Sequence, residues 1–125
     1  MRYVKVCNVT RNTVLGQKIR VASSLFDRAI GLLGTSYLSP GEGLWLKPCR
    51  SIHTLFMRYP IDALFLDAED RVVGRQTLSP WRFSKWFRKT RSVVELAAGA
   101  LDPSGTTTGD RIVFEDLPAG RQASH

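Results

Sequence analysis

Three side chains that bind soft metals or take part in covalent catalysis lie close together in the run CRSIHTLFM, residues 49–57. They are Cys49, His53 and Met57, four residues apart in each step. A thiol, an imidazole and a thioether in one loop form the ligand set of blue-copper centres, and a thiol beside an imidazole is the nucleophile–base pair of cysteine-dependent enzymes. The same run also fits a strand of a core, so the residue types alone leave three interpretations open.

Distances argue against the metal site. Two ligands of one ion lie within roughly 4 Å of each other, whereas four residues span about 13 Å along a strand. On a helix, the first and third side chains would still be about 12 Å apart. A blue-copper centre also needs a second histidine from an earlier strand, and the other histidine here is His125, the last residue. We therefore expect no metal at this run, and no cofactor.

The covalent alternative is also weakly supported, because no helix N-terminus precedes Cys49 to stabilise a thiolate. The first ten residues alternate polar and apolar side chains and do not form a secretory signal. No run reaches the roughly 18–20 apolar residues of a membrane span. We therefore expect a cytoplasmic location, no transmembrane segment, and Cys7 and Cys49 as reduced, half-buried thiols.

Polar side chains that interrupt apolar runs mark a candidate cleft. His53 and Thr54 lie in SIHTLFM, Asp62 in PIDALFLD and Glu95 in VVELAAG. Because a buried carboxylate is costly unless it is paired, each acid either holds the fold, through the backbone or Arg28, or forms the polar wall of a cleft. His53 has the matching alternatives of a core or rim histidine and a proton shuttle.

The segment PWRFSKWFRKTR, residues 80–91, mixes aromatic and basic side chains and contains no acid. The chain carries a net charge of +7, and five of the positive charges lie in this segment. Such a segment can stack on bases, lie on an anionic membrane, or form a flap whose aromatic rings cover the core while its cations are solvated. No signature of a nucleic-acid-binding fold accompanies it, so we expect the flap.

The elements that position these residues are read from hydrophobic periodicity. One helix is expected at about 24–33, capped by Ser24, with Gly34 just after its end. Short alternating runs predict strands, and the missing crossover helices exclude a doubly wound βαβ sheet. We predict a mainly β fold, a compact antiparallel β-barrel or sandwich, in a single domain over 1–117 with a flexible tail at 118–125. The expected strands are 3–9, 14–22, 43–47, 51–57, 61–67, 71–77, 92–98 and 111–117.

A set of short motifs, in this order, resembles the prokaryotic family called domain of unknown function 192, over about residues 3–114. The resemblance implies a compact β-rich fold with one helix near the N-terminus, and it implies no defined reaction. Many relatives carry an export signal or a lipid anchor. The motifs are Arg28-x-x-Gly31-Leu32-Leu33, Gly41-Glu42-Gly43-Leu44, Ser51-Ile52-His53-Thr54-x-Phe56-Met57, Pro60-Ile61-Asp62, Phe65-Leu66-Asp67, Val72-Val73, Val94-Glu95-Leu96, Gly99 and Gly109-Asp110.

These observations favour a non-catalytic, monomeric binding module for a small or polymeric anionic ligand or a partner protein. The alternatives are an enzyme that uses His53 with Asp62 or Glu95 for proton transfer, and nucleic-acid binding through 81–91. An enzyme should hold His53 within about 3–4 Å of a carboxylate. The expected site is a cleft between the helix and a hairpin at 51–67, overhung by the 81–91 flap. Its expected ligand-binding residues are Arg28, His53, Thr54, Asp62, Glu95, Trp81 and Arg82.

Overall fold

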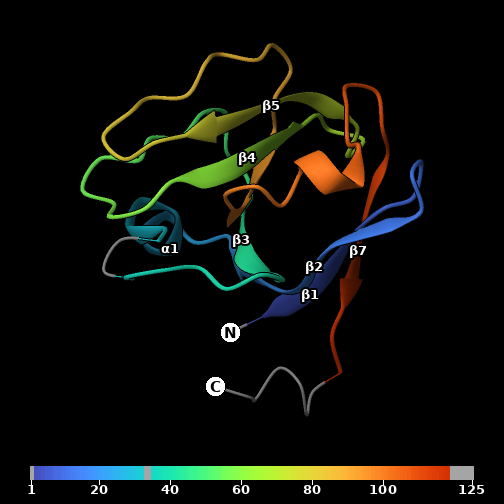
Figure 1. The fold of residues 1–125 in the computed structure, drawn as a ribbon, viewed down its shortest axis with the longest axis horizontal. Helices are drawn as coiled ribbons and strands as arrows, with labels where there is room; N and C mark the ends of the chain where they lie inside the picture. The colour runs from blue at the N-terminus through green and yellow to red at the C-terminus, as the bar shows by residue number, and fades with distance from the viewer. Residues whose placement is uncertain (1, 33–34, 119–125) are drawn as a thin grey trace.

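A computed structural model describes residues 2–32 and 35–118, and in this part of the chain seven strands form one curled sheet, a half-barrel (Figure 1). The sheet order is β5-β4-β6-β3-β2-β1-β7, so the predicted mainly β fold is confirmed. The elements are β1 (Tyr3–Asn8), β2 (Thr13–Ala22), α1 (Leu25–Ile30), β3 (Glu42–Leu46), β4 (Ile61–Leu66), β5 (Val72–Leu78), β6 (Ser92–Ala97), the 3₁₀ turn η1 (Asp102–Ser104) and β7 (Ile112–Asp116).

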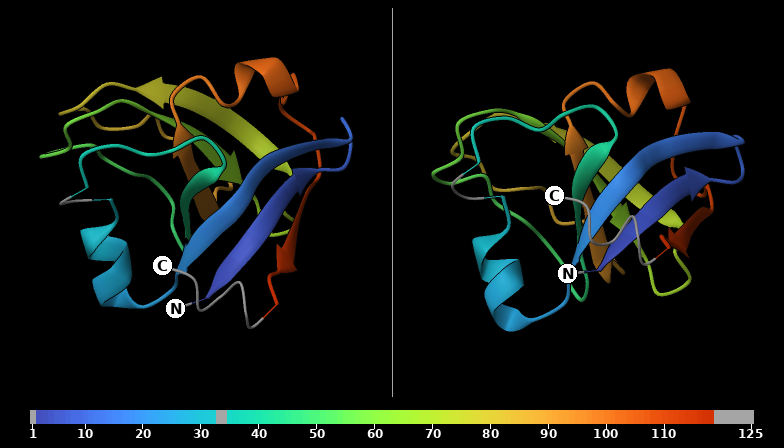
Figure 2. Two further views of the ribbon diagram at one scale, coloured as in Figure 1. Left: turned by 60° about the horizontal axis from the view of Figure 1, so that its bottom comes forward. Right: turned by 90° about the horizontal axis from the view of Figure 1, so that it is seen from below.

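Neighbouring strands run antiparallel except β2 and β3, whose parallel register extends from Lys18↔Glu42 to Ala22↔Leu46. A parallel pair cannot be joined by a tight turn and needs a crossover connection. Here the crossover contains α1. Figure 2 shows that α1 stands at one side of the curled sheet, and that β7 lies at the opposite side. This connection leaves the helix free to cover part of one face of the sheet.

The sheet is buried on both faces at its centre. All six residues of β4 and the first five of β6 are buried. Side chains alternate along a strand, so Val94 and Leu96 join one apolar cluster and Val93 joins the other. The first cluster lies with β1, β2 and β7. The second lies under α1 and the 48–57 segment, and Glu95 points toward it because it alternates with Val94 and Leu96.

The helix begins as predicted and ends earlier than predicted. The Ser24 hydroxyl accepts a hydrogen bond from the backbone N–H of Asp27 at 3.0 Å, which confirms the cap. The helix ends at Ile30, because Gly31 adopts φ = +53° and its N–H bonds back to the carbonyl of Asp27. Residues 33 and 34, the predicted end and the residue after it, lie outside the described residues, as do 119–125 of the predicted tail.

The prediction of a strand at 51–57 is wrong. His53 makes one isolated bridge with Phe83, and the chain turns at 55–56. Thr54 explains the difference, because its buried hydroxyl donates to the carbonyl of Ser79 (2.6 Å) and accepts from the N–H of Arg82 (3.0 Å). These contacts tie the run to the loop at 79–84. The predicted 51–67 hairpin is therefore absent, and β4 pairs with β5 around a turn at 68–70.

Candidate functional site

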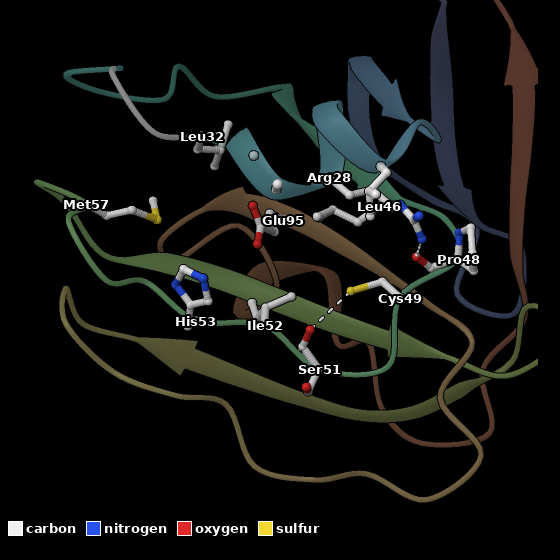
Figure 3. A pocket seen from close by; sticks show the side chains of 13 residues that line it. Arg28, Leu32, Leu46, Pro48, Cys49, Ser51, Ile52, His53, Met57 and Glu95 are labelled. Carbon is white, nitrogen blue, oxygen red and sulfur yellow. Dashed lines mark hydrogen bonds between the residues drawn. The ribbon is translucent and has the colours of Figure 1, made fainter.

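A cavity of about 300 Å³ opens between α1, the 48–57 segment and β6 (Figure 3). Its walls are mainly apolar. Leu32, Leu46, Ile52 and Met57 contribute them, and each of these side chains is at least nine-tenths buried. Five polar or ionisable residues also line it: Arg28, Cys49, Ser51, His53 and Glu95.

Glu95 is the polar group at the base of this cavity. It lies in the middle of β6, opposite Leu44 on β3 and Ala63 on β4, and it is 4 % exposed. Figure 3 shows its carboxyl group pointing into the cavity. No other described residue donates a hydrogen bond to it or forms an ion pair with it. Burial therefore acts unopposed and raises the pKa of Glu95 to about 8, so the side chain is mostly a neutral acid at pH 7.

Arg28 and Cys49 lie at the side of the cavity where α1 meets the segment after β3. The Arg28 guanidinium donates to the carbonyl of Pro48 at 2.7 Å and to that of Ser24 at 3.3 Å, which ties the helix to this segment. The Cys49 thiol donates to the carbonyl of Ser51 at 3.2 Å. Burial raises the pKa of Cys49, and a thiol that resists ionisation is a poor nucleophile.

His53 lies on the wall opposite α1. Its Nδ1 accepts a hydrogen bond from the N–H of Leu55 at 3.2 Å, and its ring meets the Phe83 ring edge-on at 6.1 Å between centroids. His53 and Glu95 line the same cavity, but neither a hydrogen bond nor an ion pair joins them. The contact between His53 and Glu95 that was expected for proton transfer is therefore absent from the described residues.

The other predicted site residues lie outside the cavity lining. Asp62 accepts hydrogen bonds from the Thr77 hydroxyl (2.7 Å) and from the N–H groups of Gly99 and Leu101 (both 3.0 Å), so it holds the turn after β6. Thr54 anchors the 79–84 loop, as described above. Trp81 and Arg82 are exposed on that loop. The structure thus brings together Arg28, His53 and Glu95, and separates them from Thr54, Asp62, Trp81 and Arg82.

Comparison with known proteins shows the family to which this chain belongs. The family model DUF192, described as "Uncharacterized ACR", matches residues 6–114. The chain belongs to the DUF192 family. Curated relatives include a UPF0127 protein of Pyrococcus furiosus, 32 % identical over 116 residues that cover 88 % of this chain and 97 % of the relative. Another is a UPF0127 protein of Pyrococcus horikoshii, 32 % identical over 113 residues that cover 86 % of this chain and 96 % of the relative.

Two solved structures share the fold of this DUF192 protein. One is a Sinorhizobium meliloti protein provisionally described as a transcription regulator, with a TM-score of 0.74 at 19 % identity over 90 % of this chain and 92 % of that one. The other is a Novosphingobium aromaticivorans protein of unknown function, with a TM-score of 0.76 at 21 % identity over 89 % of this chain and 83 % of that one. At these identities the likeness establishes the fold.

The cavity of this DUF192 protein is also lined by residues to which the sequence analysis gave other roles. Cys49 was considered as a metal ligand or as a nucleophile beside His53, and Met57 as a metal ligand, and all three line the cavity. In the described part of the chain, no three His, Cys, Asp or Glu side chains gather closely enough to hold an ion.

No described helix is long and apolar enough to cross a bilayer. Pro48 begins the 48–57 segment and Pro60 follows it. These two prolines were the signal in the sequence that this segment is a loop, because proline is rare inside a sheet.

Proposed function

We propose that this DUF192 protein is a non-catalytic binding module whose cavity holds a small ligand with an apolar body and one hydrogen-bonding group that meets Glu95. The observation that carries this proposal is the environment of Glu95, which is 4 % exposed, faces a cavity and receives no hydrogen bond from the described residues. Buried polar groups in native proteins are almost always paired. An unpaired carboxyl group at the base of a cavity therefore calls for a partner from outside the chain.

The lining sets the chemistry of the ligand. A volume of about 300 Å³ is at the lower end of the range for small-molecule sites, and such sites combine apolar walls with a few polar groups. A neutral carboxylic acid donates one hydrogen bond and accepts another, which matches an amide or a similar donor–acceptor group. Arg28 supplies positive charge at the cavity wall, so an anionic substituent would lie beside it, away from Glu95.

Binding is favoured over catalysis for two reasons. His53 and Glu95 are not in hydrogen-bond or ion-pair contact, and a general acid–base pair must reach the reacting group together. The raised pKa of Cys49 also disfavours a thiolate nucleophile. A binding site needs only the shape of the cavity and the hydrogen-bonding capacity of Glu95.

The test is a titration of the ¹⁵N-labelled protein at pH 6.5 with benzamide, which joins an aromatic ring to an amide. We expect millimolar binding and shifts of the backbone signals of Leu46, Ile52 and Glu95, which line the cavity. Glu95→Leu, which keeps an apolar side chain of similar size, should weaken binding about tenfold, the usual cost of losing one hydrogen bond.

Asp62→Asn is the matched control, because Asp62 is a buried acid outside the cavity, and this variant should bind benzamide unchanged. Equal affinity in the wild type and the Glu95→Leu variant would contradict the proposal. Shifts confined to residues outside the cavity would contradict it as well.

A further inference from the structure

Four large aromatic side chains project into solvent from two neighbouring loops. Phe56, Trp81, Phe83 and Trp86 are 68 %, 53 %, 71 % and 68 % exposed, and we call them the aromatic platform. The prediction of a flap that covers the core holds only for Phe87, which packs on Phe65 at 4.6 Å between ring centroids. Clustered exposed apolar side chains usually mark an interaction site.

The two loops that carry the platform are fixed to each other. Trp81 N–H donates to the carbonyl of Thr54 (2.9 Å), Thr54 N–H to that of Arg82 (2.8 Å) and Ser84 N–H to that of Ile52 (2.9 Å). Two further contacts hold this loop against the sheet. Lys85 N–H donates a hydrogen bond to the Gln76 side chain on β5 (2.8 Å), and the Phe87 ring packs on Phe65 of β4. The rings are thus held in solvent by an ordered backbone.

The backbone turns two of the rings outward in an uncommon way. Phe56 and Trp81 adopt φ = +66° and +65°, a region that bulky residues rarely occupy. Their rings contact each other, with centroids 4.6 Å apart. Phe83 lies against His53, so the platform reaches the rim of the cavity.

Basic residues lie beside the platform residues in the sequence, and no described ion pair neutralises them. The cations nearest in sequence are exposed, and residues 80–91 contain no acid. The described ion pairs, Arg2–Asp116, Arg11–Asp110 and Arg75–Asp102, involve none of them. These cations are Arg58, Arg82, Lys85, Arg88 and Lys89.

We propose that the aromatic platform docks this protein on the surface of an anionic lipid bilayer. Tryptophan and phenylalanine favour the headgroup region, and exposed lysine and arginine bind anionic headgroups. Figure 1 shows the 79–91 loop running outside β5, the edge strand, where a flat surface can reach it. Single-stranded nucleic acid favours a groove that follows its backbone, and the platform residues do not line the cavity beside Glu95. The proposal does not depend on a ligand in the cavity.

The test is co-sedimentation of the full chain with phosphatidylcholine vesicles, with and without phosphatidylglycerol. We expect binding only to the anionic vesicles, weakened by added salt. Each basic residue near an anionic surface contributes roughly a fivefold factor, so the double variant Lys85→Glu, Arg88→Glu should bind at least 25-fold more weakly. The double variant Trp81→Ala, Phe83→Ala should also lose binding.

The matched controls are Tyr37→Ala, an aromatic side chain 71 % exposed outside the platform, and Arg111→Glu, an exposed cation on another loop. Both should bind like the wild type, and near-ultraviolet circular dichroism checks that every variant is folded. No binding to anionic vesicles overturns the proposal, and so does binding that the platform variants do not change. Tighter binding to a single-stranded oligonucleotide, lost in the same variants, would assign the platform to nucleic acid.

Discussion

Glu95 and Asp110 are buried to the same extent, each 4 % exposed, and their surroundings are opposite. Asp110 accepts hydrogen bonds from the Asn8 amide (3.0 Å), the Arg11 guanidinium (3.0 Å) and the N–H of Thr107 (3.1 Å). Burial by itself raises the pKa of Asp110, but these donors outweigh it and lower the pKa below its usual value. None of the described residues donates a hydrogen bond to Glu95. Burial alone therefore does not distinguish an acid that is paired within the fold from one that is not, whereas the set of partners does.

The largest expected effect is on the free energy of unfolding, and it concerns Asp110, the acid that is paired within the fold. Asp110→Ala removes the acceptor of three donors, including the fully buried Asn8, and should lower the free energy of unfolding by about 3–5 kcal/mol. The control is Asp102→Ala, because Asp102 is exposed and pairs with Arg75 at the surface, where ion pairs contribute at most about 1 kcal/mol. Urea denaturation at pH 7 measures both, and similar losses in the two variants would break the comparison.

The pH dependence of stability separates the two acids. The pKa of Glu95 is about 8 in the folded protein and near 4.5 when unfolded, so the folded state binds more protons between these values and stability falls as pH rises through this window. The loss should reach about 3 kcal/mol at pH 7, and Glu95→Gln should remove it. Asp110 acts in the opposite sense, because its lowered pKa gives stability that is lost only as the pH falls below about 4. Parallel curves for the wild type and Glu95→Gln from pH 5 to 8 would contradict the assignment.

Ligand charge should follow the protonation of Glu95. At pH 6.5, neutral benzamide should bind better than cationic benzamidine, and at pH 9 the ionised carboxylate should favour benzamidine about tenfold, which is the effect of one charged hydrogen bond. Arg28, Cys49 and His53 also face this cavity, so the variant Glu95→Gln is the control. Its preference should be the same at both pH values, and a switch that persists there would place its origin elsewhere.

The smallest expected effect concerns the thiol. Because burial raises the pKa of Cys49, alkylation by iodoacetamide at pH 7.5 should be several-fold slower than that of glutathione. Saturating benzamide should slow it further, since Cys49 lines the cavity. Mass spectrometry of the peptide that contains Cys49 measures the rate, with the Cys7 peptide as internal reference. Protection of Cys7 to the same degree would indicate a general effect.

Much of the fold could be predicted from the sequence because its signals are local. Alternation of apolar residues indicated the strands, and Ser24 followed by Asp27 indicated the cap. The prediction of a strand at 51–57 was wrong because the Thr54 hydroxyl forms hydrogen bonds with residues 25 and 28 positions away in the sequence. No local pattern contains that information.

The candidate site shows the same division. Interrupted apolar runs singled out both Asp62 and Glu95 as buried acids. The sequence could not tell them apart, because two of the donors to Asp62 are backbone N–H groups 37 and 39 residues away, and the third is the Thr77 hydroxyl on the neighbouring strand. The cavity depends on the space left between α1 and the 48–57 segment. That space is a property of tertiary packing, which no single run encodes.

The pairing of β1 with β7 has a consequence for synthesis on the ribosome. Asn8 finds its partner Asp110 only 102 residues later in the chain. At translation rates of roughly 5–20 residues per second, one edge of β1 stays open for about 5–20 s while the rest of the chain is made. An open strand edge is a template for pairing with other chains. During this interval the nascent polypeptide exposes an unpaired strand edge that a chaperone can cover. The interval ends only when β7 has been synthesised and pairs with β1.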